Sequence, residues 1–265
     1  MSLSAYVSGI GVLGPGLCDW PAAASILSGR VAYAPMRTEL PTPTLLPPAE
    51  RRRTGRVVKL ALAVALEASS RANIDPAQLA SVFSSSGGDG DNCHELCRAL
   101  ALDAREISPT RFSNSVHNAA AGYWSIATGA KLASNVLCAY DASFCAGLLE
   151  AMTHVIVERE SLILVAYDTE YPEPIHAKRP IPDAFGIALI LTPVRGAHSL
   201  ARLHVALGSD AAQTMSDPQL ESLRVAIPAA RGLPLLQQLA RNQAGQTVLE
   251  YLDVSRVVVG VEPCA

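Results

Sequence analysis

The residues best placed to do chemistry lie in one short turn, residues 141–145, with the sequence Asp-Ala-Ser-Phe-Cys. Residues 135–140 before it form an apolar run of strand length, and residues 144–160 after it carry apolar side chains at helical spacing. A buried strand, a tight turn of small residues and a buried helix make up a nucleophile elbow. The free amide groups at the start of such a helix lower the pKa of a thiol or hold an oxyanion. We therefore look for the chemistry at this turn.

A second uncharged stretch, residues 118–128, precedes the turn and consists mainly of Ala, Gly, Tyr, Trp and Ile. This composition predicts a helix that is buried on all sides. Asn118 is the better candidate for its N-cap, and Asn114 is expected to have a structural role. His117 is interpreted as a hydrogen-bonded loop or interface residue in preference to a catalytic base.

These segments belong to a longer alternation of strands and helices. Strands are predicted at residues 4–10, 81–84, 135–140, 161–167, 184–194, 202–207 and 256–261, and helices at 19–27, 56–71, 92–102, 118–128, 144–160 and 233–252, the last broken near Gly245. Such alternation predicts a layered α/β/α fold with a mixed, largely parallel sheet. The Pro-studded loop 168–183 is long enough to be a rim or a partner-contact segment.

Size and composition narrow the class of protein. The 265 residues are 49% hydrophobic, yet no apolar run approaches the ~20 residues that a membrane span needs. No secretory signal is evident, and a net charge of −3 argues against a nucleic-acid-binding protein. Six Cys in a chain of this size favour a reduced, cytoplasmic protein.

Two motifs suggest a cofactor or a metal, and both have simpler interpretations. Gly9-x-Gly-x-x-Gly14 matches a dinucleotide fingerprint, but Pro15 follows it and no strand ending in an acidic residue comes at the required distance. A glycine turn is therefore favoured. Cys93 and Cys97 share a helix face, but His94 points elsewhere and no second pair of ligands exists. We expect neither a cofactor nor a metal.

The turn resembles the N-terminal half of a β-ketoacyl synthase, a condensing enzyme with the thiolase fold. In that family an Asp-Thr-Ala-Cys-Ser-Ser-Gly-like turn carries the Cys that accepts the acyl chain. Here Asp141, Ala142 and Ser143 take the first three places, Phe144 takes the place of the Cys, and Gly147 matches the closing Gly. The resemblance therefore puts Phe at the nucleophile position.

Other stretches agree with this resemblance: residues 7–16 with Trp20 and residues 27–30, the Arg-rich residues 51–56, and the Ser-rich residues 84–89. The run Asn-Ser-Val-His-Asn-Ala-Ala-Ala-Gly-Tyr-Trp at residues 114–124 is similar to short, chain-length-factor-like proteins of aryl-polyene pigment clusters. The resemblance implies a ketosynthase-like N-terminal domain at residues 1–195. Residues 196–265 are then expected to be a short C-terminal extension packed on the same domain.

The resemblance also implies a role. A ketosynthase needs a thiolate and two His from its second half, but here Phe144 cannot be acylated and the tail offers only His198 and His204, outside any recognisable motif. We therefore expect a non-catalytic, chain-length-factor-like subunit of a type II fatty-acid or polyketide (aryl-polyene) synthase. Such a subunit pairs with a catalytic ketosynthase and helps to shape the acyl channel, with the Phe144 ring as a plug or wall.

The alternative is an acyl-transfer or condensing enzyme that uses Cys145 as its thioester nucleophile. A slip of one residue would place this sulfur at the helix N-terminus, where a low pKa is expected. However, neighbours on a helix lie ~100° apart around its axis, so the side chain should point away from the site. A buried free Cys is also common as a small hydrophobic residue.

Two surfaces are expected to bind partners. Arg51, Arg52, Arg53 and Arg56 form a basic run that is either a solvated helix entry or a docking patch for an acidic acyl carrier protein. The apolar residues 118–128 and 135–140 would leave an exposed patch and an open sheet edge on a lone domain. This predicts a dimer, either of two copies or with a catalytic ketosynthase.

Overall fold

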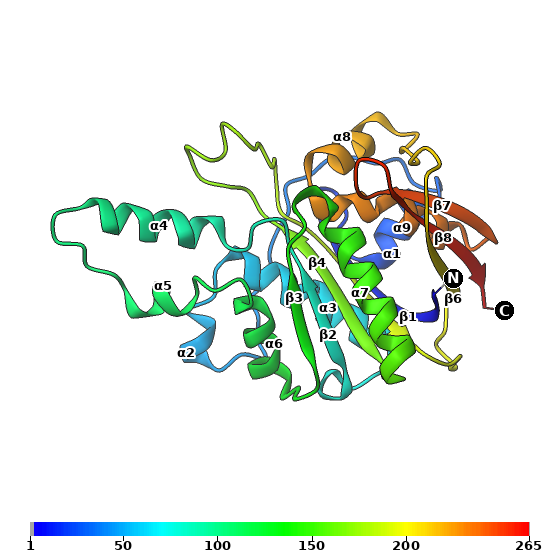
Figure 1. The fold of residues 1–265 in the computed structure, drawn as a ribbon, viewed down its shortest axis with the longest axis horizontal. Helices are drawn as coiled ribbons and strands as arrows, with labels where there is room; N and C mark the ends of the chain where they lie inside the picture. The colour runs from blue at the N-terminus through cyan, green and yellow to red at the C-terminus, as the bar shows by residue number, and fades with distance from the viewer. Residues whose placement is uncertain (1–2, 265) are drawn as a thin grey trace.

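The computed structural model describes residues 3–264, which form one eight-stranded sheet with helices on both faces (Figure 1). The sheet order is β3-β2-β4-β5-β1-β6-β8-β7. The strands are β1 (Leu3–Leu13), β2 (Ala80–Ser84), β3 (Ser134–Leu137), β4 (Leu162–Asp168), β5 (Phe185–Thr192), β6 (Ala201–Gly208), β7 (Gly245–Glu250) and β8 (Arg256–Pro263).

The helices connect and cover these strands. They are α1 (Trp20–Leu27), α2 (Pro48–Arg51), α3 (Arg56–Ala72), α4 (Gly90–Ala101), α5 (Pro109–Ser113), α6 (Ala119–Thr128), α7 (Ser143–Glu158), α8 (Pro218–Ala226) and α9 (Leu233–Arg241). Short 3₁₀ turns lie at η1 (Pro76–Gln78), η2 (Tyr140–Ala142) and η3 (Pro228–Gly232). Helices α4 and α5 project from the body as an arm (Figure 1). Within the described residues, no helix combines the length and the apolar character needed to cross a membrane.

The predicted α/β/α layering and the mixed sheet are confirmed, but the sheet is not largely parallel. Of the seven strand pairings in the described residues, only β2–β3 and β2–β4 are parallel. A parallel pair needs a long crossover, usually a helix, whereas antiparallel neighbours need none. No α-helix lies between β4 and β5 or between β7 and β8, and each of these pairs is antiparallel. No α-helix lies between β5 and β6 either, and β6 pairs antiparallel with β1 and β8.

Two apolar clusters lie on the two faces of the sheet. One packs α7, α1, η3 and α9 against one face and contains Phe144, Cys145 and Leu148. The other packs α3 and α6 against the opposite face and contains Leu60 and Trp124. Both faces are therefore covered over the central strands, and the turn before α7 lies at the edge of the first cluster.

The glycines of the dinucleotide-like motif serve packing inside β1. A Cβ atom at Gly9 would lie 2.1 Å from the carbonyl oxygen of Ala68, and one at Gly11 would lie 2.0 Å from that of Val64. Helix α3 therefore rests directly on the backbone of β1. The predicted glycine turn is wrong for Gly9 and Gly11, which lie within the strand, and turn geometry begins only at Gly14.

Two helix predictions need correction. The helix predicted at residues 233–252 ends at Arg241, because Asn242 adopts the left-handed conformation with φ of 50°, and β7 follows. Helix α6 is not buried on all sides: Trp124 is buried but Ile126 is 52% exposed. A helix without charges gives no sequence signal of which face is covered. Helix α8, which no sequence pattern suggested, lies between β6 and α9.

Candidate functional site

The predicted strand, turn and helix of the elbow are present as β3, η2 and α7. The strand predicted at residues 135–140 ends at Leu137, and the prediction that it is buried is wrong, because β3 lies at the edge of the sheet with its first two residues exposed. The Ser143 hydroxyl accepts a hydrogen bond from the amide of Ala139 at 3.1 Å and donates one to the carbonyl of Tyr140 at 2.7 Å. Tyr140 has φ of 52°, a conformation that is strained for a residue with a side chain. The turn is therefore closed by its own side chain and holds strain at its first residue.

Phe144, at the position that the resemblance gives to the nucleophile, is fully buried in the apolar core. A Cβ atom placed on Gly232 would lie 2.6 Å from the Phe144 ring and 2.8 Å from Ile187 Cδ1. The ring therefore packs directly against the backbone of η3, which belongs to the C-terminal part of the chain. Only glycine leaves it this space.

Cys145 follows Phe144 near the start of α7 and contacts the end of β7. Its Sγ donates to the carbonyl oxygen of Glu250 at 3.2 Å, and its side chain is 1% exposed. Burial raises the pKa of the Cys145 thiol to about 12. At neutral pH the residue is therefore a protonated thiol inside the protein.

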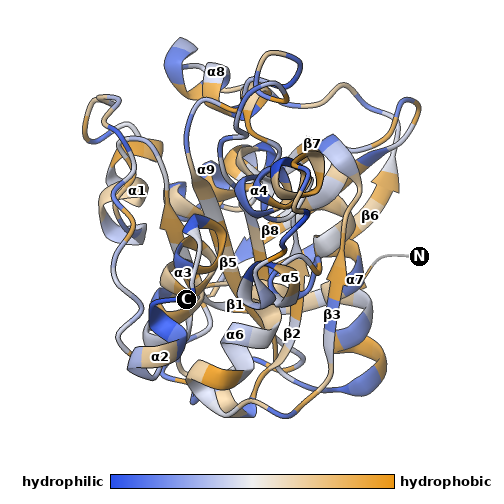
Figure 2. Ribbon diagram, turned by 90° about the vertical axis from the view of Figure 1, so that its left-hand side faces the viewer, coloured by the Kyte–Doolittle hydropathy of each residue, from blue (hydrophilic) through white to orange (hydrophobic). Residues whose placement is uncertain are grey.

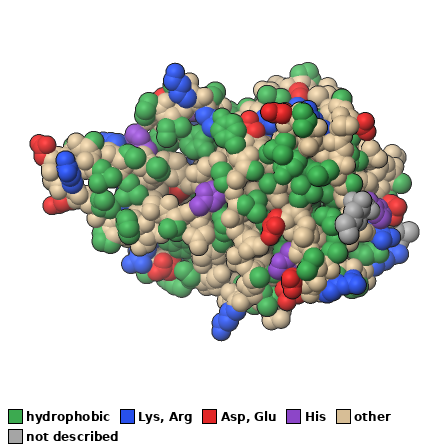
Figure 3. All heavy atoms as spheres, viewed as in Figure 1, with side chains coloured by type: hydrophobic (Ala, Val, Ile, Leu, Met, Phe, Trp, Pro, Cys, Tyr) green, Lys and Arg blue, Asp and Glu red, His purple; other side chains and the backbone are tan. Residues whose placement is uncertain are grey.

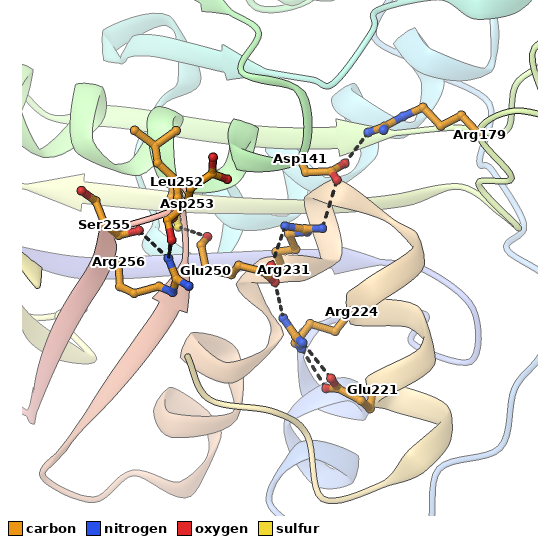
Figure 4. Close-up of polar contacts among 11 residues, drawn as sticks. Asp141, Arg179, Glu221, Arg224, Arg231, Glu250, Leu252, Asp253, Ser255 and Arg256 are labelled. Atoms are coloured by element: carbon orange, nitrogen blue, oxygen red, sulfur yellow. Dashed lines mark hydrogen bonds and ion pairs between the residues drawn. The ribbon is translucent and has the colours of Figure 1, made fainter. Parts of the chain in front are cut away.

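A chain of ion pairs, here named the elbow clamp, joins the turn to the C-terminal segment (Figure 4). It consists of Arg179, Asp141, Arg231, Glu250, Arg224 and Glu221. Asp141 is the first residue of the turn motif. One carboxylate oxygen of Asp141 accepts from Arg179 at 2.6 Å and the other from Arg231 at 3.1 Å. The guanidinium of Arg179 also lies 3.7 Å from the centre of the Tyr140 ring. Asp141 is thus held by the loop after β4 and by η3 together.

The elbow clamp continues into the C-terminal segment. Arg231 lies 3.4 Å from the Glu250 carboxylate at the end of β7, which also pairs with Arg224 at 3.1 Å. Arg224 binds Glu221 through two nitrogens, at 2.7 and 2.8 Å. The Arg224 and Arg231 side chains are 8% and 12% exposed, whereas the Glu250 and Asp141 carboxylates are 39% and 38% exposed, so solvent reaches the acidic side of these pairs. No local pattern predicts this arrangement, because Asp141 lies 38 and 90 positions from the two Arg that bind it.

Asp168, at the carboxyl end of β4, is a buried carboxyl group that joins the two parts of the chain. It accepts hydrogen bonds from the amides of Ser86 and Ala229, both at 2.8 Å, and from the Ser85 hydroxyl at 3.5 Å. Burial raises its pKa to about 6, against the hydrogen bonds from Ser86, which lower it. The sequence feature that points to Asp168 is its position as an acidic residue at the end of an otherwise apolar strand.

The polar residues before α6 have structural contacts. Asn114 donates to the carbonyl of Arg53 at 3.0 Å and accepts from the Tyr123 hydroxyl at 3.2 Å. Asn118 occupies the N-cap position of α6, but its side chain makes no capping hydrogen bond, so the predicted position is right and the side-chain cap is wrong. The buried Nε2 of His117 has no hydrogen-bond partner among the described residues, and burial lowers the pKa of His117.

The basic run is divided between internal and solvent-facing residues. Arg56 pairs with Glu170 at 3.1 Å, and Arg53 pairs with Glu50 at 3.0 Å. Arg51 and Arg52 make no ion pair with the described residues, and Arg52 is exposed. The part of the run that is free to meet a partner is therefore Arg51 and Arg52, with half-exposed Arg53 beside them.

Comparison with known proteins supplies the family. A family model described as the N-terminal domain of β-ketoacyl synthase matches residues 28–250. No curated protein sequence matches the chain.

Three solved structures share the fold over almost the whole chain. A chain from the complex of the ketosynthase ApeO with its chain length factor ApeC, from Xenorhabdus doucetiae, is 24% identical with a TM-score of 0.73, covering 97% of this chain and 99% of that chain. A chain of the ishigamide ketosynthase/chain length factor is 14% identical with a TM-score of 0.74, covering 99% and 100%. A chain of AntDE:AntF, a type II PKS acyl-carrier protein in complex with its ketosynthase bound to the hexaketide, is 10% identical with a TM-score of 0.73, covering 100% of both.

The family model covers most of the chain, including the elbow and the elbow clamp, and the solved relatives share its layered fold. This chain belongs to the β-ketoacyl synthase N-terminal domain family.

Proposed function

We propose that the chain is a non-catalytic, chain-length-factor-like subunit of a type II fatty-acid or polyketide synthase. In this role it pairs with a catalytic ketosynthase and contributes to the wall of the acyl channel. The observation that carries the proposal is that Phe144, which the resemblance aligns with the acyl-accepting Cys, is fully buried. A phenyl ring has no nucleophilic atom, so this position cannot form a thioester.

The other groups that could replace the missing chemistry are poorly placed for it. The Cys145 thiol is buried, is bonded to a backbone carbonyl and has a pKa raised to about 12. A thiol attacks as its thiolate, which is scarce at neutral pH when the pKa is this high. His204 lies on β6 beside Glu262, and His198 lies exposed in the turn before that strand.

Pairing is supported by surfaces that the chain leaves uncovered. Strand β3 is an edge of the sheet, and its first two residues are exposed. Large apolar side chains are exposed on the nearby arm and on α6, including Leu100 at 51%, Phe112 at 66% and Ile126 at 52%. Figure 3 shows hydrophobic side chains gathered on the arm. Edges and apolar patches of this kind are usually covered by a partner.

The names of the similar structures support the choice of partner. Two of them are complexes or proteins described as ketosynthase with chain length factor, and a third includes an acyl-carrier protein. From the run at residues 114–124 we further propose that the synthase makes an aryl polyene. We also propose that acyl carrier protein docks on Arg51, Arg52 and Arg53. The division at residue 195 and the cytoplasmic location stay predictions.

The proposal is tested by incubating the purified chain with acyl-loaded and malonyl-loaded carrier protein, alone and together with a ketosynthase that has an intact Cys and two His. We expect no chain extension by the chain alone, and extension by the pair. Mass spectrometry of the carrier-bound products measures both results.

A Cys145→Ser variant provides the matched control. Extension by the wild-type chain alone that disappears in this variant would establish the Cys145 enzyme instead. The ketosynthase could also extend the acyl chain at the same rate and to the same length with and without this protein. That result would contradict the proposed role in shaping the channel.

A further inference from the structure

A cavity of about 670 Å³ lies between α3 and the coil that joins α1 to α2. Figure 2 shows this coil running along the side of the molecule from α1 to α2. Small-molecule sites have volumes of roughly 300–1,000 Å³. No residue of the elbow or the elbow clamp lines this cavity, so it is separate from the site described above.

The cavity is preformed, because hydrogen bonds hold its outer wall in place. The amide of Thr38 donates to the Asp183 carboxylate at 2.8 Å, and its hydroxyl donates to the carbonyl of Ala184 at 2.9 Å. On the other side, the amide of Gly16 donates to the carbonyl of Met36 at 2.8 Å. The coil is thus tied both to the start of β5 and to the turn after β1, with α3 beneath it.

The floor of the cavity is apolar. It includes Leu13, Leu17 and Leu62, which are at most 8% exposed, and the partly buried Ala63 and Leu66 on the outer face of α3. A hydrocarbon chain laid on this floor would displace water from apolar surface, which is favourable.

Most of the charged side chains around the cavity already have an ion-pair or hydrogen-bond partner within the protein. The Glu67 carboxylate accepts from the amides of Val12 and Trp20 and pairs with Arg71 at 2.9 Å. Asp19 accepts from the amide of Ala22 as the cap of α1.

Arg37 lies 3.7 Å from Glu170. Besides the Asp19 carboxylate that caps α1, two lining charges remain without an ion pair among the described residues, Lys59 and Glu39.

These two charges differ in position. Glu39 is exposed on the coil, whereas Lys59 is partly buried on α3, the helix that forms the floor. Lys59, Ala63 and Leu66 follow one another at helical spacing on one face, and Lys59 and Leu66 are about 10 Å apart along the axis. A single ammonium group thus stands at one end of an apolar floor.

We propose that this cavity binds an amphipathic carboxylic acid, with the carboxylate on Lys59 and the hydrocarbon tail over Ala63 and Leu66. The proposal does not rest on the function proposed above. An ammonium beside an apolar floor complements an anionic head and an apolar tail. The same floor favours neither a cationic head, which Lys59 repels, nor a fully polar ligand.

The test uses isothermal titration calorimetry of the full chain with decanoate, decanol and decylamine. We expect binding in the order decanoate, decanol, decylamine. The Lys59→Met variant keeps the apolar stem and removes the charge, so it should weaken decanoate about five-fold and leave decanol unchanged. Lys131→Met, which removes an exposed charge away from the cavity, is the matched control and should bind decanoate like wild type.

A second variant, Ala63→Trp, locates the binding by filling the floor and should reduce decanoate binding at least ten-fold. Equal binding of decanoate to wild type and Lys59→Met, or stronger binding of decylamine than of decanoate, would overturn the proposal. Unchanged binding by a folded Ala63→Trp chain would place the ligand elsewhere and overturn it as well. If Ala63→Trp fails to fold, the Lys59→Met comparison alone decides.

Discussion

At the scale of single residues, the elbow contains Phe144, a side chain that cannot act as a nucleophile. Phe144 fills the core against Gly232, and Cys145 is turned to the carbonyl of Glu250. Asp141 and Asp168 then carry the polar contacts that hold the C-terminal part against the turn. Asp141 and Asp168 therefore have structural roles, and the pKa of Asp168 is raised.

The first prediction concerns the pH dependence of stability through Asp168. Its pKa is about 6 in the folded protein against an ordinary value of 3.8, so the folded state binds this proton more tightly than the unfolded state does. The stabilisation is complete below about pH 4 and is lost as the pH rises through about 6, on the order of 3 kcal/mol in all. The Asp168→Asn variant loses this titration.

Urea unfolding at pH 4, 5, 6 and 7 measures the effect. The stability of wild type relative to Asp168→Asn should fall as the pH rises over this range. Asp210→Asn, at an exposed position, should run parallel to wild type. Parallel curves for wild type and Asp168→Asn would show that the buried carboxyl is not protonated near pH 6.

At the scale of elements, β3 and α6 each leave one side uncovered by the chain itself. Strand β3 has the parallel neighbour β2 on one side only, and the exposed side of α6 carries Ile126. The opposite edge strand, β7, is partly covered, since the amide of Gln213 donates to the carbonyl of Val248 at 2.8 Å. The uncovered edge at β3 is thus the natural place for a second subunit to continue the sheet.

We predict dimerisation at β3, with a second copy or with a ketosynthase, and its loss in Val136→Arg. A charge introduced into an edge strand opposes strand addition. Light scattering of the wild type and the variant, with circular dichroism to check folding, makes the comparison.

Leu132→Arg places the same charge on an exposed residue just before the strand and should keep the dimer. A wild-type chain that stays monomeric at high concentration and binds no ketosynthase would show that β3 needs no partner.

At the scale of the whole molecule, charge is distributed unevenly on a chain whose net charge is only −3. Arg56 is held by Glu170, whereas Arg51 and Arg52 have no ion pair within the described residues. A local positive region on an acidic protein attracts an acidic partner and orients it during encounter.

We predict that carrier protein binding weakens as ionic strength rises, because added salt screens this attraction. A variant with Arg51, Arg52 and Arg53 replaced by Ala should bind several-fold more weakly at low salt and show a flatter salt dependence. Fluorescence anisotropy of labelled carrier protein measures both. Replacement of the exposed Arg30, Arg98 and Arg241 removes the same charge elsewhere, and equal losses in the two variants would leave only a general charge effect.

The sequence by itself determined the local elements and the family. Apolar periodicity located most strands and helices, because that signal depends only on neighbours in the chain. The resemblance of the motif around Phe144, matched at both of its ends, predicts that Phe stands at the nucleophile position, and helical geometry predicts that Cys145 points away from it. Both stay predictions. These conclusions needed no knowledge of which segments meet.

The tertiary structure decided what depends on contacts between distant segments. Strand direction followed from the connections, so the largely parallel sheet was wrong. Residues 245–250 became a strand because β8 pairs with them, although their spacing also suited a helix. The bonds that Asp141 makes with Arg179 and Arg231, and that Asp168 makes with the amide of Ala229, join residues that are 38 to 90 positions apart, and only folding brings such groups together. The same contacts place the C-terminal segment over the elbow, a position that no local pattern encodes.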